Sequence, residues 1–134
     1  MNTDKTEVKV IKAEVNTVNE VDIRATARLI GMQPHLLGYR YTVTAVMLLL
    51  EHPELIDAVV KELYTAVART HSTTGSRVER SIRHSIDLIS RVPLTAKAYE
   101  VFTSCINERG EFNKPTVSAF LANITEYLKY DYKS

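Results

Sequence analysis

A scarcity of turn residues constrains the fold of this chain more than any other feature. The sequence holds four Gly and four Pro among 134 residues, which is too few for the many turns of a multi-stranded sheet. Between them run long blocks of Ala, Leu, Ile, Val, Glu and Arg, in which apolar residues recur at helical spacing. The chain is therefore predicted to be all-α.

Apolar periods and stop signals divide the chain into six expected helices. The run from Tyr41 to Leu50 is apolar nearly all round, which is typical of a central helix surrounded by other elements. Pro53 ends this run and suits the first turn of the helix that follows. We expect the six helices to span residues 20–30, 41–50, 53–68, 75–90, 96–106 and 115–130.

The helices account for one domain, preceded by a short segment of different character. Residues 1–18 are polar and show no clear apolar period, so we expect a flexible N-terminal segment there. Residues 19–134 are then a single helical domain, in keeping with the chain's length.

Several functional classes receive no support from the sequence. The single cysteine, Cys105, cannot form an internal disulfide, and there is no signal peptide, so a cytoplasmic protein is expected. The longest apolar stretch, residues 43–50, is far shorter than the roughly 20 residues of a membrane span. The four His residues lack metal-ligand spacing, so neither a metal nor another cofactor is expected. A Gly-rich phosphate loop and a paired-carboxylate site are also missing, which argues against an enzyme.

Positive charge is concentrated in the middle of the chain although the net charge is only +1. Residues 69–91 contain five Arg against two acidic residues. Residues 71–74, His-Ser-Thr-Thr, have turn and N-cap character and separate two expected helices. Two helices joined by such a turn, with the second rich in Arg, are typical of a helix-turn-helix that places its second helix in the DNA major groove.

The second of these helices has two distinct faces on a helical wheel. Its apolar residues fall on one stripe that we expect to pack on the domain, namely Val78, Ile82, Ile86 and Ile89. Its polar residues fall together on the outward side, namely Ser76, Arg77, Glu79, Arg80, Arg83 and His84. Arg can bind guanine, a carboxylate can accept from cytosine, and His or Ser can hold a phosphate. The same face is also compatible with a merely solvated surface, in which Glu79 and Arg83 form an ordinary i,i+4 ion pair.

A family resemblance favours DNA reading over the solvated surface. The segment from Ser72 to Ile86, STTGSRVERSIRHSI, closely resembles the recognition-helix signature of the stage-zero sporulation response regulator family. Residues 35–41, HLLGYRY, and residues 54–64 are similar to that family's second and third helices. Lys114-Pro115-Thr116 with Phe120, and the Lys133-Ser134 ending, resemble its last helix.

The resemblance implies a function and a set of contacts. In that family a six-helix effector domain, with a helix-turn-helix formed by its third and fourth helices, binds a TGTCGAA-type box as a tandem dimer. The resemblance implies base contacts from Arg77, Glu79 and Arg80, contacts to bases or phosphates from Arg83 and His84, and a backbone contact from Lys133. Residues 92–109 depart from the family pattern, and this stretch adjoins the surface through which the family engages the RNA polymerase sigma factor.

The expected protein is thus a sequence-specific DNA-binding transcription regulator that acts as a homodimer or tandem dimer on double-stranded DNA. The family's N-terminal receiver domain does not fit into residues 1–20, so the chain is either an excised effector domain or a stand-alone relative. The start Met1-Asn2-Thr3-Asp4 favours a complete short protein. The alternative function is a protein-interaction module that titrates a full-length regulator or RNA polymerase without reading DNA.

Overall fold

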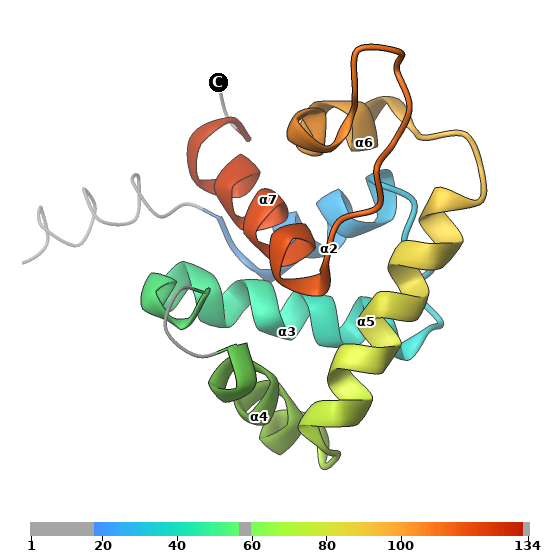
Figure 1. Cartoon of the computed structure of the whole chain (residues 1–134). Coiled ribbons are helices and arrows are strands. Elements are labelled where there is room, and N and C mark those ends of the chain that lie inside the picture. The colour runs from blue at the N-terminus through green and yellow to red at the C-terminus, as the bar shows by residue number, and fades with distance from the viewer. Residues whose placement is uncertain (1–17, 57–59, 133–134) are drawn as a thin grey trace, which may run out of the picture.

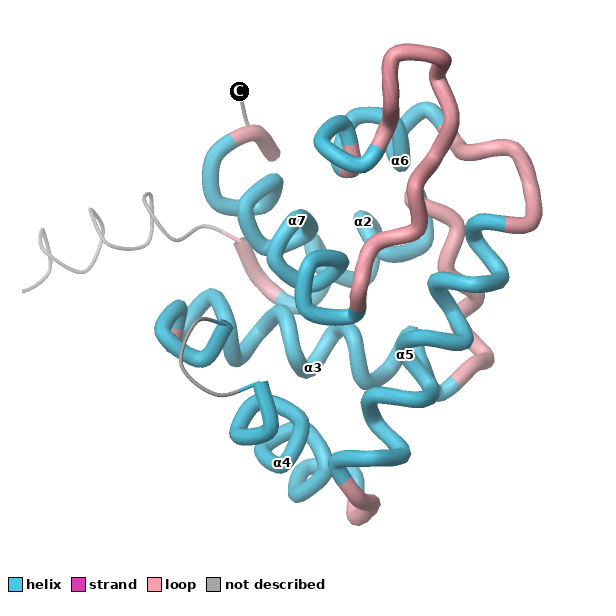
Figure 2. The backbone as a smooth tube through the Cα atoms, viewed as in Figure 1, coloured by secondary structure: helices cyan, strands magenta, loops and turns pink. Residues whose placement is uncertain are grey.

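The computed structural model describes residues 18–56 and 60–132. This part of the chain is built from helices and loops, with six α-helices and two 3₁₀ turns and no strand (Figures 1 and 2). The α-helices are α2 (Glu20–Leu29), α3 (Leu37–Glu51), α4 (Val60–His71), α5 (Gly75–Ser90), α6 (Ala96–Val101) and α7 (Val117–Tyr130). The prediction of an all-α fold with six helices is confirmed.

Helix α3 is the centre of the bundle, as its apolar sequence predicts. It crosses the middle of the molecule and contacts α2, α4, α5 and α7 (Figure 1). Ala45 and Val46 are completely buried in it. The helix begins at Leu37, however, four residues before the expected start, and so it includes Gly38.

The segment after α3 differs from the single expected helix. Pro53–Ile56 forms a 3₁₀ turn, and α4 spans Val60–His71. Pro53 starts the turn as predicted, since its missing N–H is not needed in a first turn. On α4, Leu63 and Val67 are buried, which is the apolar spacing that the sequence indicates.

The C-terminal third also departs from expectation at its helix ends. Helix α6 stops at Val101 and is followed by a 3₁₀ turn, Thr103–Cys105, instead of continuing to residue 106. Phe102 lies at this break and is completely buried, stacked on Phe120 of α7 with ring centroids 5.2 Å apart. A long loop then leads to α7, which begins after the N-cap Thr116 (Figure 2). Burying one large aromatic at the chain reversal outweighs continuing a short helix.

The buried residues of α5 are those that the helical wheel predicts. Val78 and Ile82 are fully buried, and Ile86 and Ile89 are nearly so. The stripe packs on α3 and α4, and its C-terminal half approaches α7. This packing fixes which face of α5 points to solvent.

Among the helices that the structure describes, none combines the length and the apolar character that crossing a bilayer requires.

Candidate nucleic-acid interface

The turn between α4 and α5 is tight and internally bonded. Ser72 adopts a left-handed conformation with φ 53°, and the Thr73 N–H donates to the Ala68 carbonyl at 3.0 Å, which closes the end of α4. Thr74 is the N-cap of α5, and its hydroxyl accepts a hydrogen bond from the Arg77 N–H at 3.3 Å. The two helices therefore form a helix-turn-helix in which three residues make the turn.

Gly75, the first residue of α5, lies beside the middle of α4. A Cβ placed on Gly75 would lie 3.5 Å from the Tyr64 Cβ and 3.7 Å from the Thr65 backbone nitrogen. The start of α5 therefore rests directly on the middle of α4, and the orientation of its first turn is set by packing.

Removing the N-cap should loosen this first turn. We expect Thr74→Ala to cost about 1 kcal/mol of stability, because the Arg77 N–H loses its side-chain acceptor. Thr74→Ser keeps a hydroxyl at the same position and should behave like the wild type. Urea denaturation of the three proteins measures the difference, and an equal loss for Ser and Ala would show that the hydroxyl does not act as the cap.

His71 attaches the turn to the central helix. Its Nε2 lies 2.7 Å from the Thr44 hydroxyl of α3, and its ring packs edge-on against Tyr41 at a centroid distance of 5.0 Å. Burial, assisted by the nearby Arg40 charge, lowers the pKa of His71, so the imidazole stays neutral near pH 7. Sequence reasoning missed this anchor, since Thr44 and His71 are far apart in the chain and nothing in their spacing pairs them.

The outward side of α5 carries the predicted polar residues. Arg77, Arg80 and His84 are exposed, and no ion pair joins Arg77 or Arg80 to another residue of the described chain. Ser76 is also exposed, beside the N-terminus of the helix, where partial positive charge from the backbone favours anions. The structure thus brings these side chains onto the solvent-facing side of α5.

Glu79 and Arg83 differ from their neighbours because they bind each other. The Arg83 guanidinium lies 3.0 Å from the Glu79 carboxylate, the i,i+4 ion pair that the sequence left open as an alternative. The Glu79 side chain is 28% exposed and lies beside Tyr64 of α4. Burial raises the pKa of the Tyr64 phenol, and the nearby Glu79 charge raises it further. Glu79 is therefore held at the edge of the face, with Arg83 as its partner.

A shallow groove of about 450 Å³ borders this face between α4, α5 and the start of α7. Across it, Lys114 donates to the Asp87 carboxylate at 2.8 Å, which ties the loop before α7 to α5. This hydrogen bond is the main reason that the pKa of Asp87 falls below its ordinary value. Lys114 was not predicted as a site residue, although it adds a cation at the edge of the face.

The remaining sequence predictions fall elsewhere. Lys133 lies outside the described residues. Cys105 is half-buried, with its sulfur 3.9 Å from the Ser104 hydroxyl. Among the residues that the structure describes, no group of three or more His, Cys, Asp or Glu side chains could hold a metal ion.

A helix-turn-helix whose second helix presents an exposed, Arg-rich face defines a DNA-binding domain. A comparison with known families agrees: the family described as "Sporulation initiation factor Spo0A C terminal" matches residues 23–128 of the chain. The chain belongs to this family. It is a DNA-binding effector domain of the Spo0A type, and the resemblance seen in the sequence is confirmed.

Proposed function

We propose that the chain reads a specific DNA sequence by placing α5 in the major groove. The observation that carries this proposal is the unpaired, exposed position of Arg77 and Arg80 on the outward face of α5. The apolar stripe on the other side of the helix is buried, so the helix can enter a groove only by this face. Residues 19–134 act as the DNA-binding unit, with residues 1–18 as a segment outside it.

Each residue of the face has a chemical role in the proposal. Arg77 and Arg80 fork onto guanine O6 and N7, and Glu79 accepts from a cytosine N4 amino group. Ser76, at the helix N-terminus, and His84, on the flank, hold phosphates. Arg83 reaches a base or a phosphate from its ion pair with Glu79.

The Glu79–Arg83 pair gives this arrangement a defined geometry before DNA binds. A carboxylate facing DNA repels phosphates, and the Arg83 charge at 3.0 Å offsets that repulsion. Binding a cytosine amino group leaves one carboxylate oxygen available for Arg83. Glu79 can therefore contact a base while it remains paired with Arg83. The contact adds sequence specificity and leaves no unpaired negative charge facing the DNA.

The proposed target is a TGTCGAA-type box in double-stranded DNA, bound by two copies as a homodimer or in tandem. An electrophoretic mobility shift on a duplex with two boxes, compared with a scrambled duplex, tests the proposal. We expect the boxed duplex to bind at least about a thousandfold more tightly, the usual lower range for specific over non-specific binding. Equal affinity for both duplexes would favour the interaction module, which titrates a full-length regulator or the polymerase.

A contact with the RNA polymerase sigma factor is a further part of the proposed function. The chain between α5 and α6 exposes Val92, with 61% of its surface accessible, and Tyr99 of α6 is 47% exposed. Exposed apolar side chains beyond the C-terminal end of α5 suit a protein partner bound to neighbouring DNA. In this role the protein regulates transcription in the bacterial cytoplasm.

Lys133 is proposed to contact a DNA phosphate. Lys133→Ala should then lower the affinity for boxed and for scrambled DNA by the same factor, because a phosphate contact carries no direct sequence information. It should also make the slope of log K against log salt shallower by about 0.9, the value for one neutralised phosphate on B-DNA.

Arg80→Ala is the matched comparison for Lys133→Ala. A residue that binds only a base edge should alter the preference among single-base variants of the box and leave the salt slope nearly unchanged. Titrations of both variants at several salt concentrations separate the two roles. An unchanged slope for Lys133→Ala would remove Lys133 from the interface.

A further inference from the structure

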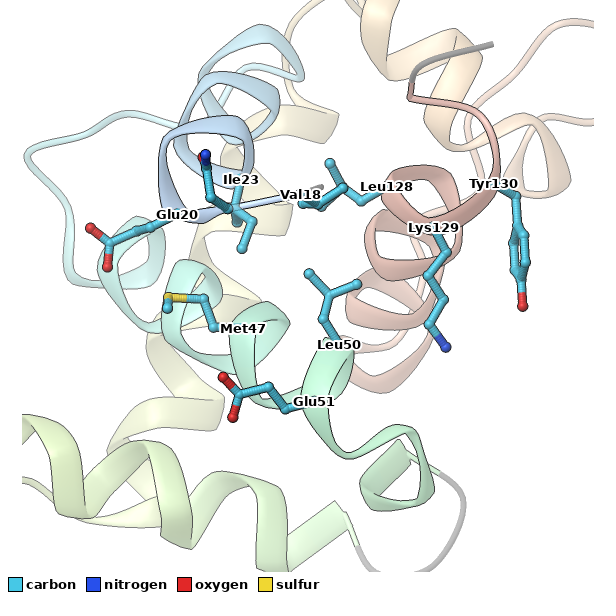
Figure 3. A pocket seen from close by; sticks show the side chains of 10 residues that line it. Val18, Glu20, Ile23, Met47, Leu50, Glu51, Leu128, Lys129 and Tyr130 are labelled. Atoms are coloured by element: carbon cyan, nitrogen blue, oxygen red, sulfur yellow. The ribbon is translucent and has the colours of Figure 1, made fainter. Parts of the chain in front are cut away.

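A second surface lies at the opposite end of α3 from the recognition helix. There, a hollow of about 600 Å³ opens between α2, α3 and α7 (Figure 3). Helix α5 contacts α3 near Gly38, whereas this hollow is bordered by the last turns of α3 and α7. Its apolar lining consists of Val18, Ile23, Met47, Leu50 and Leu128. It is therefore separate from the proposed DNA contacts.

The hollow leaves apolar side chains of the core accessible. Ile23 and Leu128 are buried at its base, whereas Val18, Met47 and Leu50 are only partly buried although they pack on the core. Charged side chains stand on its two sides, with Glu20 and Glu51 on one and Lys129 on the other (Figure 3). An apolar groove with a charged rim is typical of a binding site for an amphipathic helix.

The segment that precedes Val18 in the same chain is a candidate to bind in this groove. Val18, where the described chain begins, is part of the lining, and residues 1–17 are attached to it. Three residues span at most about 11 Å, so the Cα of Val15 cannot lie farther than that from the Cα of Val18. Any apolar side chains in this segment are therefore held near the groove at high effective concentration.

The segment has apolar residues at the spacing that such a groove requires. Val8, Ile11 and Val15 follow one another at intervals of three and four residues, a spacing that places them on one face of a helix. Val10 falls on the opposite face. The period rests on three side chains among many polar residues, so it is weak in the sequence taken alone.

The charges of the segment also match the rim. On the same helical wheel, Lys5, Lys9 and Lys12 lie on one side of the apolar stripe, and Glu7 and Glu14 lie on the other. The groove has the carboxylates of Glu51 and of Glu20, which is also paired with Arg24 at 2.9 Å, on one side and an ammonium group on the other. A helix seated with its lysines toward Glu20 and Glu51 brings its glutamates toward Lys129.

We propose that residues 8–15 form an amphipathic helix that covers this groove of their own chain, with Ile11 and Val15 against Leu50 and Leu128. The contact closes the open end of the core between α3 and α7. It involves none of the residues proposed to bind DNA, and so it does not depend on the proposed function.

Nuclear Overhauser effects between methyl groups test this contact in the full chain. We expect cross-peaks between the methyl groups of Ile11 or Val15 and those of Leu50 or Leu128. In a mixture of labelled and unlabelled protein, an isotope-filtered spectrum should lack these cross-peaks, since the contact is within one chain. An absence of the cross-peaks in the fully labelled protein, or their presence between chains, would overturn the proposal.

Two substitutions in the segment give an independent test. Ile11→Asp removes a side chain from the stripe, whereas Val10→Asp places the same carboxylate on the opposite face of the helix. Hydrogen exchange of amides 8–15 should become at least about tenfold faster in Ile11→Asp than in Val10→Asp, because only the first change opens the contact. Equal exchange rates in the two variants would show that the stripe is not seated.

Discussion

Gly38→Val should destabilise the domain by about 3 kcal/mol or more and lower its affinity for DNA. A Cβ at position 38 would lie 2.0 Å from the Ser85 hydroxyl oxygen and 2.5 Å from the Ser81 carbonyl oxygen. The hydroxyl can rotate away, but the carbonyl belongs to the backbone of α5. Helices α3 and α5 must therefore separate to admit the side chain, and overpacking of this kind costs about 1 to 3 kcal/mol and sometimes more.

The displacement should act on function as well as stability. Ser81 and Ser85 lie on the same helix as Arg77 and Arg80, so moving α5 away from α3 shifts the whole face that is proposed to contact DNA. A shift of about 1 Å is enough to impair hydrogen bonds that demand heavy-atom distances near 3 Å. Urea denaturation and DNA titration of Gly38→Val measure the two effects.

Gly75→Ala is the control for Gly38→Val. A Cβ at Gly75 meets its nearest neighbour at 3.5 Å, an ordinary van der Waals contact, and the residue is the first of α5. Its φ is not in the left-handed region, so Ala fits without strain. If Gly38→Val were as stable as Gly75→Ala, the close packing of α3 on α5 would be wrong.

Gly38 also shows where the sequence misleads. A glycine before an apolar run predicts a helix boundary, because glycine is the poorest ordinary helix former apart from proline. Here the glycine lies inside α3, where the absence of a side chain allows α5 to approach. That approach is a contact between residues more than forty positions apart, and a local propensity cannot reveal it.

The buried and exposed faces of α5 were predictable because they depend only on local spacing within one helix. A regular helix converts sequence spacing directly into direction, so the stripe of Val78 and Ile82 predicted the buried side without knowledge of its partners. The ion pair of Glu79 with Arg83 is likewise a neighbour contact along one helix. By contrast, His71 on Thr44 and Lys114 on Asp87 join different elements, and only the folded chain brings them together.

Replacing both exposed arginines should abolish most of the sequence preference. Each bidentate contact to guanine contributes about 1 to 3 kcal/mol of discrimination, so Arg77→Ala with Arg80→Ala should lose about 2 to 6 kcal/mol if the contributions add. In affinity for the boxed duplex this is a loss of about 30-fold to more than 10,000-fold. The fold should be retained, because both side chains are exposed and neither is paired with a described residue.

Arg109→Ala is a control for the loss of positive charge outside α5; it removes one charge, half of what the double variant loses. Arg109 is exposed in the loop before α7, outside the α5 face, so its removal lowers the net charge without touching the proposed base contacts. We expect the ratio of boxed to scrambled affinity to fall by about 30-fold or more in the double variant, whereas Arg109→Ala keeps the wild-type ratio. Both variants should show the wild-type unfolding midpoint in urea. A double variant that kept the wild-type ratio of boxed to scrambled affinity would mean that Arg77 and Arg80 bind only phosphates. Sequence recognition would then have to come from Glu79 and Arg83, which are paired with each other at 3.0 Å.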